Sequence, residues 1–312
     1  MKNPQMFPQI GLIAALPLLL LGCDEALEPG TKVDSFRVLA EQVDQPYAQP
    51  GETVQLSSLS FDPDGRQVTW AWASCVNPDS SDLYGCLAQI AESADPASAV
   101  FAMGADVDSA ALTVPADAIS SLPAVARAAA TVGVVSVACP GDLSMGAGPG
   151  GLPFRCQEAG GGRDLELDEF VVGFKRITVR EAERNRNPVI TGVTFDGADW
   201  PEDEIKTVGF CNATDFVYDT CASKEKHQLA VQLSASSFEK GTDELGRAFD
   251  EQVVIQHYAT EGIFQYEVRT GESPKNGWVA RKRASGQTLR LWFVARDDRG
   301  GVSWAERQVT VR

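Results

Sequence analysis

Histidine is scarce in this sequence, and its scarcity limits the chemistry that the chain could catalyse. Only His227 and His257 are present among 312 residues, and both lie in stretches with the apolar pattern of strands. The G-x-S-x-G turn that presents a nucleophilic serine is absent, and so are the C-x-x-C and C-x-x-H spacings of zinc sites. We therefore expect both histidines to be structural, and we expect the protein to be no enzyme and to need no cofactor.

Positive charge is also sparse. Lys and Arg number 27 against 43 Asp and Glu, which gives a formal net charge of -16. The nearest candidate for a basic patch is the three-residue run 281–283, between an expected turn and an expected strand. Nucleic-acid binding rests on many contacts between cations and phosphates, so we expect no nucleic-acid partner. A G-x-G-x-x-G pattern at 146–151 runs into Leu152-Pro153, which cannot open the helix that dinucleotide binding requires.

The apolar run near the start of the chain is too short to span a bilayer. It begins near Ile10 and closes with L-L-G-C at Cys23, about a dozen residues against the roughly 20 that a transmembrane helix needs. With Lys2 before it, this is the order of parts in a bacterial lipoprotein signal peptide, residues 1–22. Leu21 is a departure, because that position is more often small or β-branched. An ordinary secretory signal would place small residues in an A-x-A-like pattern before the cut, and no such pattern precedes Cys23.

Lipidation would make Cys23 the first residue of the mature chain, with acyl chains on its sulfur and its amino group. Two such chains hold a protein stably on a membrane, whereas one does so only marginally. We therefore expect a membrane partner reached through Cys23, and a place in the cell envelope that faces the periplasm or the cell surface. Loss of residues 1–22 removes the charge of Lys2 and changes the net charge from -16 to -17.

The six other cysteines are even in number, which suits an exported protein with disulfides. They form three couples that are close in sequence, each around a polar or glycine-rich stretch: Cys75–Cys86, Cys139–Cys156 and Cys211–Cys221. We expect these three bridges. On the chain-entropy account each would add about 3 kcal/mol to stability.

Strand patterns fill the first half of the mature chain after a short polar tether, residues 23–32. The stretches that alternate or run apolar as strands do are 33–43, 53–61, 68–72, 131–138 and 170–179. The patterns weaken over 75–130, where we expect an insertion with one or two short helices, and over the glycine-rich insertion 140–163. Residues 33–180 are therefore predicted to form one β-sandwich.

A second unit is expected to repeat this outline after the charged linker 181–187. Strand patterns return at 189–195, 229–233, 253–258, 263–269, 289–295 and 302–311. A cysteine-clipped insertion is expected at 198–226. Residues 188–312 are therefore predicted to form a second sandwich, and the fold class is predicted to be all-β with two tandem antiparallel β-sandwiches.

Several motifs resemble immunoglobulin-like domains of the PKD type. They are P-G-E-T-V-x-L at 50–56, D-P-D-G at 62–65 and V-T-W-A-W at 68–72. The strand that runs into D-x-x-G-G at 297–301 is similar to the last hairpin of such domains. The resemblance covers residues 33–312 apart from the insertions, and the chain as a whole is similar to uncharacterised lipoproteins of the myxobacterial type. It implies an immunoglobulin-like sandwich and a role as a spacer, adhesive module or carbohydrate-associated appendage.

Two acidic turns are candidates for a calcium site, since Ca²⁺ prefers six to eight oxygen ligands. They contain Asp62 with Asp64, and Asp297 with Asp298. The competing interpretation is that these aspartates bind the backbone of their own turns, as aspartates commonly do. The latter is favoured, and we expect no metal, because the twelve-residue calcium loop with its terminal glutamate is absent.

Two tryptophans are candidates for stacking on sugars. Trp200 and Trp278 lie in loop-like stretches beside Pro201 and Gly277, whereas the other tryptophans are expected in the core. Exposure of both rings would favour glycan binding.

The sequence as a whole predicts a lipid-anchored envelope protein that acts as a non-enzymatic interaction or scaffold component. A glycan-binding or adhesion module is the alternative. A hydrolase with its site in the loop insertions is the third reading. The expected partner, besides the membrane, is an envelope protein or a glycan.

Overall fold

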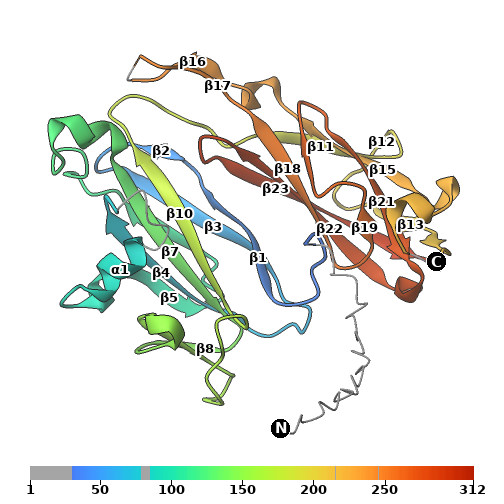
Figure 1. The fold of residues 1–312 in the computed structure, drawn as a ribbon, viewed down its shortest axis with the longest axis horizontal. Coiled ribbons are helices and arrows are strands. Elements are labelled where there is room, and N and C mark those ends of the chain that lie inside the picture. Colours follow the sequence, from blue (N-terminus) through green and yellow to red (C-terminus); the bar gives the residue numbers. More distant parts are fainter. Residues whose placement is uncertain (1–29, 79–84, 215, 245) are drawn as a thin grey trace, which may run out of the picture.

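The structure is a computed structural model that describes residues 30–78, 85–214, 216–244 and 246–312. Strands dominate it, and its helices are few and short. Figure 1 shows two β-sandwiches side by side, one from the first half of the chain and one from the second. The all-β fold class expected from the sequence is confirmed. No helix within the described ranges is long and apolar enough to cross a membrane.

The first sandwich packs a three-stranded sheet on a five-stranded one. The small sheet runs in the order β1 (Arg37–Val43), β3 (Thr53–Phe61), β6 (Ser109–Thr113). The large sheet runs in the order β2 (Tyr47–Ala48), β10 (Val171–Val179), β7 (Thr131–Cys139), β4 (Thr69–Val76), β5 (Val100–Ala105). Period-two alternation turns Val54 and Leu56 of β3 inward, where they share a core with Trp70 and Trp72 of β4.

Strand β7 is buried on both faces, which its nearly continuous apolar sequence predicts. Val132 and Val134 face the core between the sheets, while Val135 and Val137 lie in a second cluster on the outer face of the large sheet. The layer over that outer face consists of α1 (Gly85–Ala91) and the hairpin of β8 (Asp142–Met145) and β9 (Phe154–Gln157). The 3-10 turns of this half are η1 (Pro96–Ala99), η2 (Ala124–Ala129) and η3 (Pro149–Gly151).

The second sandwich is built from a six-stranded and a five-stranded sheet. The first of them contains β12 (Ala198–Asp199), β11 (Ile190–Phe195), β15 (His227–Leu233), β21 (Lys275–Arg281) and β14 (Phe210–Cys211), with β19 (Ile263–Phe264) also on β21. The second runs β13 (Ile205–Val208), β23 (Val302–Val311), β22 (Thr288–Asp297), β18 (Val253–Ala259), β20 (Val268–Thr270). A separate hairpin joins β16 (Lys240–Thr242) to β17 (Ala248–Asp250), and the 3-10 turns are η4 (Tyr218–Thr220), η5 (Ser223–Glu225), η6 (Ala235–Ser237) and η7 (Lys282–Ala284).

The expected insertions contain more strand than their sequences indicated. The predicted loop region 75–130 supplies β5 and β6, and the glycine-rich stretch 140–163 supplies the β8–β9 hairpin. The predicted insertion 198–226 supplies β13, which pairs parallel with β23, so the sandwiches are not wholly antiparallel. Edge strands β2 and β14 are parallel to their neighbours as well. These strands are only two to six residues long, and an alternation of apolar residues over so few positions predicts a strand only weakly.

The two sandwiches meet through β1 of the first and β22 of the second. Alternation sends Leu291, Phe293 and Ala295 of β22 into the second core, which leaves Trp292 and Val294 on its outer face. Both are nevertheless buried, at 1% and 0% exposure, because Leu39 and Ala40 of β1 cover them. Strand β22 is therefore buried on both faces, like β7.

The described chain begins along an edge of the second sandwich, where Arg37 of β1 also binds it. Lys32 forms a parallel bridge with Ala259 at the end of β18. The backbone N–H of Val33 donates to Ala259 O at 2.9 Å, and the N–H of Ala259 donates to Thr31 O at 2.9 Å. The last residues of the predicted tether thus extend a sheet edge of the second sandwich before the chain enters β1.

Candidate functional site

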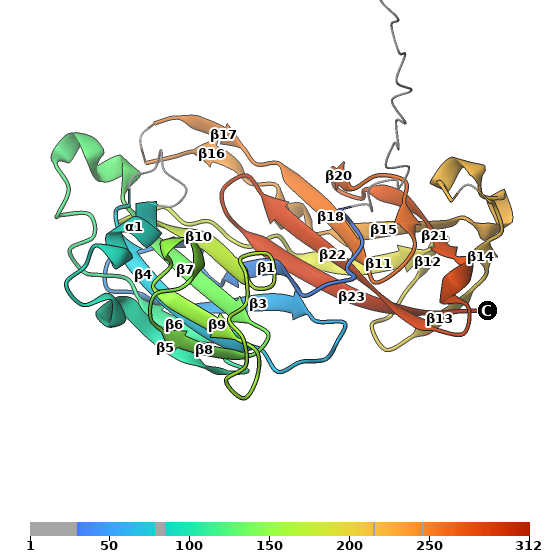
Figure 2. The ribbon, with the colours of Figure 1, turned by 60° about the horizontal axis from the view of Figure 1, so that its bottom comes forward.

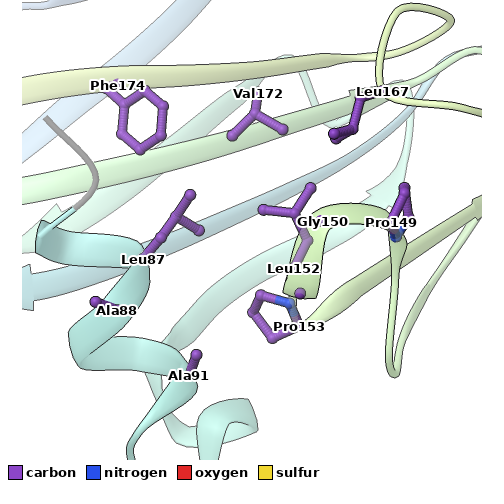
Figure 3. Close-up of a pocket in the computed structure, with 11 residues that line it drawn as sticks. Leu87, Ala88, Ala91, Pro149, Gly150, Leu152, Pro153, Leu167, Val172 and Phe174 are labelled. Carbon is purple, nitrogen blue, oxygen red and sulfur yellow. The ribbon is translucent and has the colours of Figure 1, made fainter.

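An apolar groove lies on the outer face of the first sandwich, between the two insertions that cover the large sheet (Figure 3). Its volume is about 620 Å³. Helix α1 forms one wall, the loop between β8 and β9 forms the other, and β10 forms the floor. This size falls within the range of small-molecule and peptide-side-chain sites in proteins.

A disulfide fixes the helical wall to the sheet. Cys86 of α1 is bonded to Cys75 of β4, with the two Cα atoms 5.6 Å apart. Gly133 of β7 makes this approach possible, because a Cβ at this position would lie 2.7 Å from Cys75 Sγ. The helix then buries Ile90 against the sheet and presents Leu87, Ala88 and Ala91 to the groove.

A second disulfide fixes the opposite wall. Cys156 of β9 is bonded to Cys139 at the end of β7, with a Cα–Cα distance of 5.7 Å. Gly148 allows the loop above to close tightly, because a Cβ there would lie 1.8 Å from Phe154 O. Phe154 is fully buried under this loop. Together with Cys211–Cys221, these bridges confirm the three pairings predicted from the sequence.

The groove lining has no chemistry for proton transfer or nucleophilic attack. Besides alanine, proline and glycine, the residues that line it are Leu87, Leu152, Leu167, Val172 and Phe174. Leu167 is 53% exposed at the rim. All of these side chains are apolar and none is ionisable. The groove therefore suits contact with an apolar surface.

Buried charges gather at the junction of the two sandwiches. Glu41 of β1 accepts a hydrogen bond from Ser136 Oγ, and Lys175 Nζ donates to Gly300 O of the second sandwich at 2.6 Å. Burial raises the pKa of Glu41 against the opposing effects of Ser136, Lys175 and Arg296. Burial, with the charge of Arg296, lowers the pKa of Lys175 to about 8. These groups hold the junction together, since each contacts a partner in the structure and none faces the groove.

The acidic turns use their carboxylates internally. Asp62 accepts hydrogen bonds from the backbone N–H, Nε and Nη2 of Arg66, at 2.9, 2.8 and 2.8 Å. Partial burial opposes ionisation of Asp62, but the hydrogen bonds from Arg66 outweigh it and lower the pKa of the carboxyl. Asp64 lies 3.5 Å from the same guanidinium. The capping interpretation is confirmed for this turn.

The second acidic turn is built in the same way. Asp297 Oδ1 accepts from the backbone N–H groups of Arg299 and Gly301, at 2.8 and 2.7 Å. Asp298 Oδ1 accepts from the N–H of Gln252 at 3.2 Å. Within the described ranges, no group of three or more His, Cys, Asp or Glu side chains is close enough to hold a metal ion.

The expectation that Trp200 and Trp278 have exposed rings is wrong. Their exposures are 1% and 0%, and both belong to the core of the second sandwich. The ring of Trp200 packs edge-on against Phe195 at 5.0 Å between centroids, and its Nε1 donates to Glu204 O at 2.9 Å. Neither ring is accessible to stack on a sugar.

Both histidines lie in strands, as expected. His227 of β15 has Nδ1 at 2.9 Å from Asp196 Oδ2. His257 of β18 lies between Phe264 and Phe293, with ring centroids 5.2 and 5.8 Å away. Burial lowers the pKa of His257 to about 4. The lipidation candidate Cys23 and the signal sequence lie outside the described residues.

Comparisons with known proteins identify no family. No family model matches the sequence, and no curated protein matches it. Similar solved structures include the D0-D1 domain of intimin, with 12% identity over 88% of this chain and 98% of that chain and a TM-score of 0.22. A structure on host cell surface retention of a 1.5-MDa bacterial ice-binding adhesin has 9% identity over 88% and 66%, with a TM-score of 0.20. Bacteroides uniformis beta-glucuronidase 3 has 10% identity over 87% and 24%, also with a TM-score of 0.20.

Such low identities and TM-scores support no conclusion about function. In the part of the chain that the structure describes, the architecture is mostly β, with several sheets, few helices and three disulfides.

Proposed function

We propose that this protein is a lipid-anchored component of the cell envelope that binds a partner and catalyses no reaction. The observation that carries the binding role is the groove between α1 and the β8–β9 hairpin, whose lining is apolar throughout. Concave apolar surface on a soluble domain is a typical feature of interaction sites. We propose an apolar segment of an envelope protein as its occupant.

The sequence and the disulfides support the location. L-L-G-C at Cys23 has the form of a lipidation site, and the six other cysteines are paired in three bridges. Disulfides persist in oxidising compartments such as the periplasm and the cell surface. The candidate residues for glycan binding, Trp200 and Trp278, are buried, so they do not support the glycan-binding alternative.

The anchor is tested by the intact mass of the protein purified from its native membrane, with thiols labelled before and after reduction. We expect the chain to start at an acylated Cys23 and to gain six labels only after reduction. An unlipidated start, or thiols that react before reduction, would contradict the location.

The groove is tested with Leu167→Glu, which places a charge at its rim. Leu167 is 53% exposed, so the change should leave the fold intact. The matched control is Ile205→Glu, also at 53% exposure but on β13 of the second sandwich. Crosslinking in cells should give an adduct that Leu167→Glu loses and Ile205→Glu keeps. An adduct that persists in both variants would refute the groove as the contact site.

The hydrolase reading has its own test. The purified mature chain is incubated with generic esters and peptides, and we expect no turnover above that of heat-denatured protein. Turnover abolished by a change in an insertion would replace the binding role with a catalytic one.

A further inference from the structure

The start of the described chain lies against the loop that leads into β20. A Cβ built on Gly30 would lie 3.9 Å from Oε1 of Glu267. Arg37 holds this position, because its Nη1 donates to Gly30 O at 2.8 Å and to Lys32 O at 3.0 Å. Strand β20 and residues 31–33 both pair with β18, so they occupy one edge of the sheet (Figure 2). We name residues 30–37 and 266–269 the N-terminal edge patch.

This patch carries two exposed apolar side chains only two positions apart in sequence. Tyr266 is 47% exposed and Val268 is 45% exposed, on either side of Glu267. The guanidinium of Arg269 lies 4.6 Å from the centroid of the Tyr266 ring. The other large apolar side chains that are exposed in the described chain stand apart from one another in sequence: Met103, Val125, Leu167, Val189, Ile205 and Val217.

The charge of the patch differs in sign from that of the protein. It contains three cations, Lys32, Arg37 and Arg269, and two anions, Asp34 and Glu267, so its formal charge is +3 − 2 = +1. The mature chain carries -17, which is the -16 of the full sequence less the charge of Lys2. The net charge of the chain is therefore repelled by anionic head groups, whereas the net charge of this patch is not.

The length of chain between the anchor and the patch is short. Gly30 lies seven positions after Cys23, and a fully extended chain spans at most about 3.5 Å per residue, or about 25 Å over that stretch. The patch is the part of the described structure to which this chain connects, so it cannot move far from an acylated Cys23.

We propose that the N-terminal edge patch rests on the lipid surface, with Tyr266 and Val268 in the head-group region and Arg269 beside the phosphates. This inference depends on the proposed acylation of Cys23. Tyrosine is favoured at the boundary between water and hydrocarbon, and arginine reaches phosphate with its apolar stem buried. The acyl chains supply the affinity for the membrane, and the patch sets the orientation of the protein upon it.

Quenching of an added tryptophan by brominated phosphatidylcholine tests this orientation. Val268→Trp is compared with Ile205→Trp in the full lipidated chain reconstituted into vesicles. Ile205 is the matched control, since β13 is the opposite edge strand of the same five-stranded sheet. Vesicles without bromine give the reference, and the parent protein gives the signal of its native tryptophans.

We expect fractional quenching of the added fluorescence to be at least about twofold greater at 268 than at 205, because only position 268 would reach the brominated chains. A further Tyr266→Ser change should reduce the quenching at 268. Equal quenching at the two positions, with the protein still sedimenting with the vesicles, would overturn the patch and leave the anchor intact. Failure of the chain to sediment, as expected of a Cys23→Ser control, would overturn both proposals.

Discussion

Trp292→Ala should weaken the junction between the two sandwiches while leaving each of them folded. The ring lies on the outer face of β22, at 1% exposure, in a cluster with Val33 and Leu39 and with its centroid 5.0 Å from that of Phe61. It contributes nothing to the core of the second sandwich, which takes the alternate residues of β22. The packing cost of its removal therefore falls on the junction, and only the hydrogen bond from its Nε1 to Glu306 Oε2 is lost within the second sandwich.

The magnitude follows from the area that the ring buries. A tryptophan side chain buries about 200 Å², and about 25 cal/mol per Å² gives about 5 kcal/mol as an upper bound. Measured truncations of buried Trp and Phe cost about 3 to 5 kcal/mol. With about 4 kcal/mol lost and a factor of ten for each 1.4 kcal/mol, the opening equilibrium of the junction should shift by about a thousandfold.

Trypsin cleavage of the linker under native conditions measures this opening. The trypsin sites Arg184 and Arg186 lie in the linker. The next residue, Asn187, is bound to the first sandwich, because its Nδ2 donates to Val43 O at 2.8 Å. When opening is faster than cleavage, the cleavage rate follows the open population, so Trp292→Ala should raise it up to about a thousandfold. Trp292→Phe keeps an aromatic ring beside Phe61 and should have a much smaller effect. Linker cleavage within about threefold of the parent in Trp292→Ala would refute this account of the junction.

Three further predictions concern pH and the groove. Burial raises the pKa of Glu251 to about 7, so the free energy of unfolding should fall as pH rises from 4.5 through 7. Glu251→Gln should remove that fall in urea titrations at several pH values, and an unchanged profile would contradict the prediction. Burial lowers the pKa of His257 to about 4, so the free energy of unfolding should fall as pH drops from 6.5 through 4. His257→Phe should make the thermal midpoint less dependent on pH in that window. A pH dependence equal to that of the parent would exclude His257 as its origin. Replacing Cys139 and Cys156 by serine removes a disulfide that closes a loop of 17 residues, and should lower the free energy of unfolding by about 3 kcal/mol in chemical denaturation. A loss under about 1 kcal/mol would argue against the chain-entropy account of this bridge.

The strands of the two cores could be predicted because their apolar patterns are long. The run Thr131–Cys139 predicts burial on both faces, and the structure shows that the insertions cover the second face. Leu291–Ala295 is an equally continuous run, but here the covering surface is the other sandwich. Sequence periodicity reports that a strand is covered on both sides and carries no information about which segment covers it.

The groove and the burial of Trp200 and Trp278 could not be predicted from the sequence, because both depend on contacts between segments that are distant in the chain. Gly277 beside Trp278 favours a loop in the sequence, yet it lies in strand β21. A side chain there would clash with Tyr218, because a Cβ on Gly277 would lie 2.0 Å from Tyr218 Oη. Trp200 precedes Pro201 and is buried through its contact with Phe195. The disulfide pairs could be predicted because each pair is close in sequence, but the groove between two of them exists only in three dimensions.

The attachment of residues 30–33 at the junction determines where mechanical tension would enter the molecule. A pull on an anchored N-terminus would load two contacts together: the side chain of Arg37 in β1, which holds Gly30 O, and the two backbone hydrogen bonds at Ala259 in β18. Tension would therefore enter where the two sandwiches meet, and both would share it. The groove between α1 and the β8–β9 hairpin lies on the outer face of the first sandwich and takes no part in this attachment.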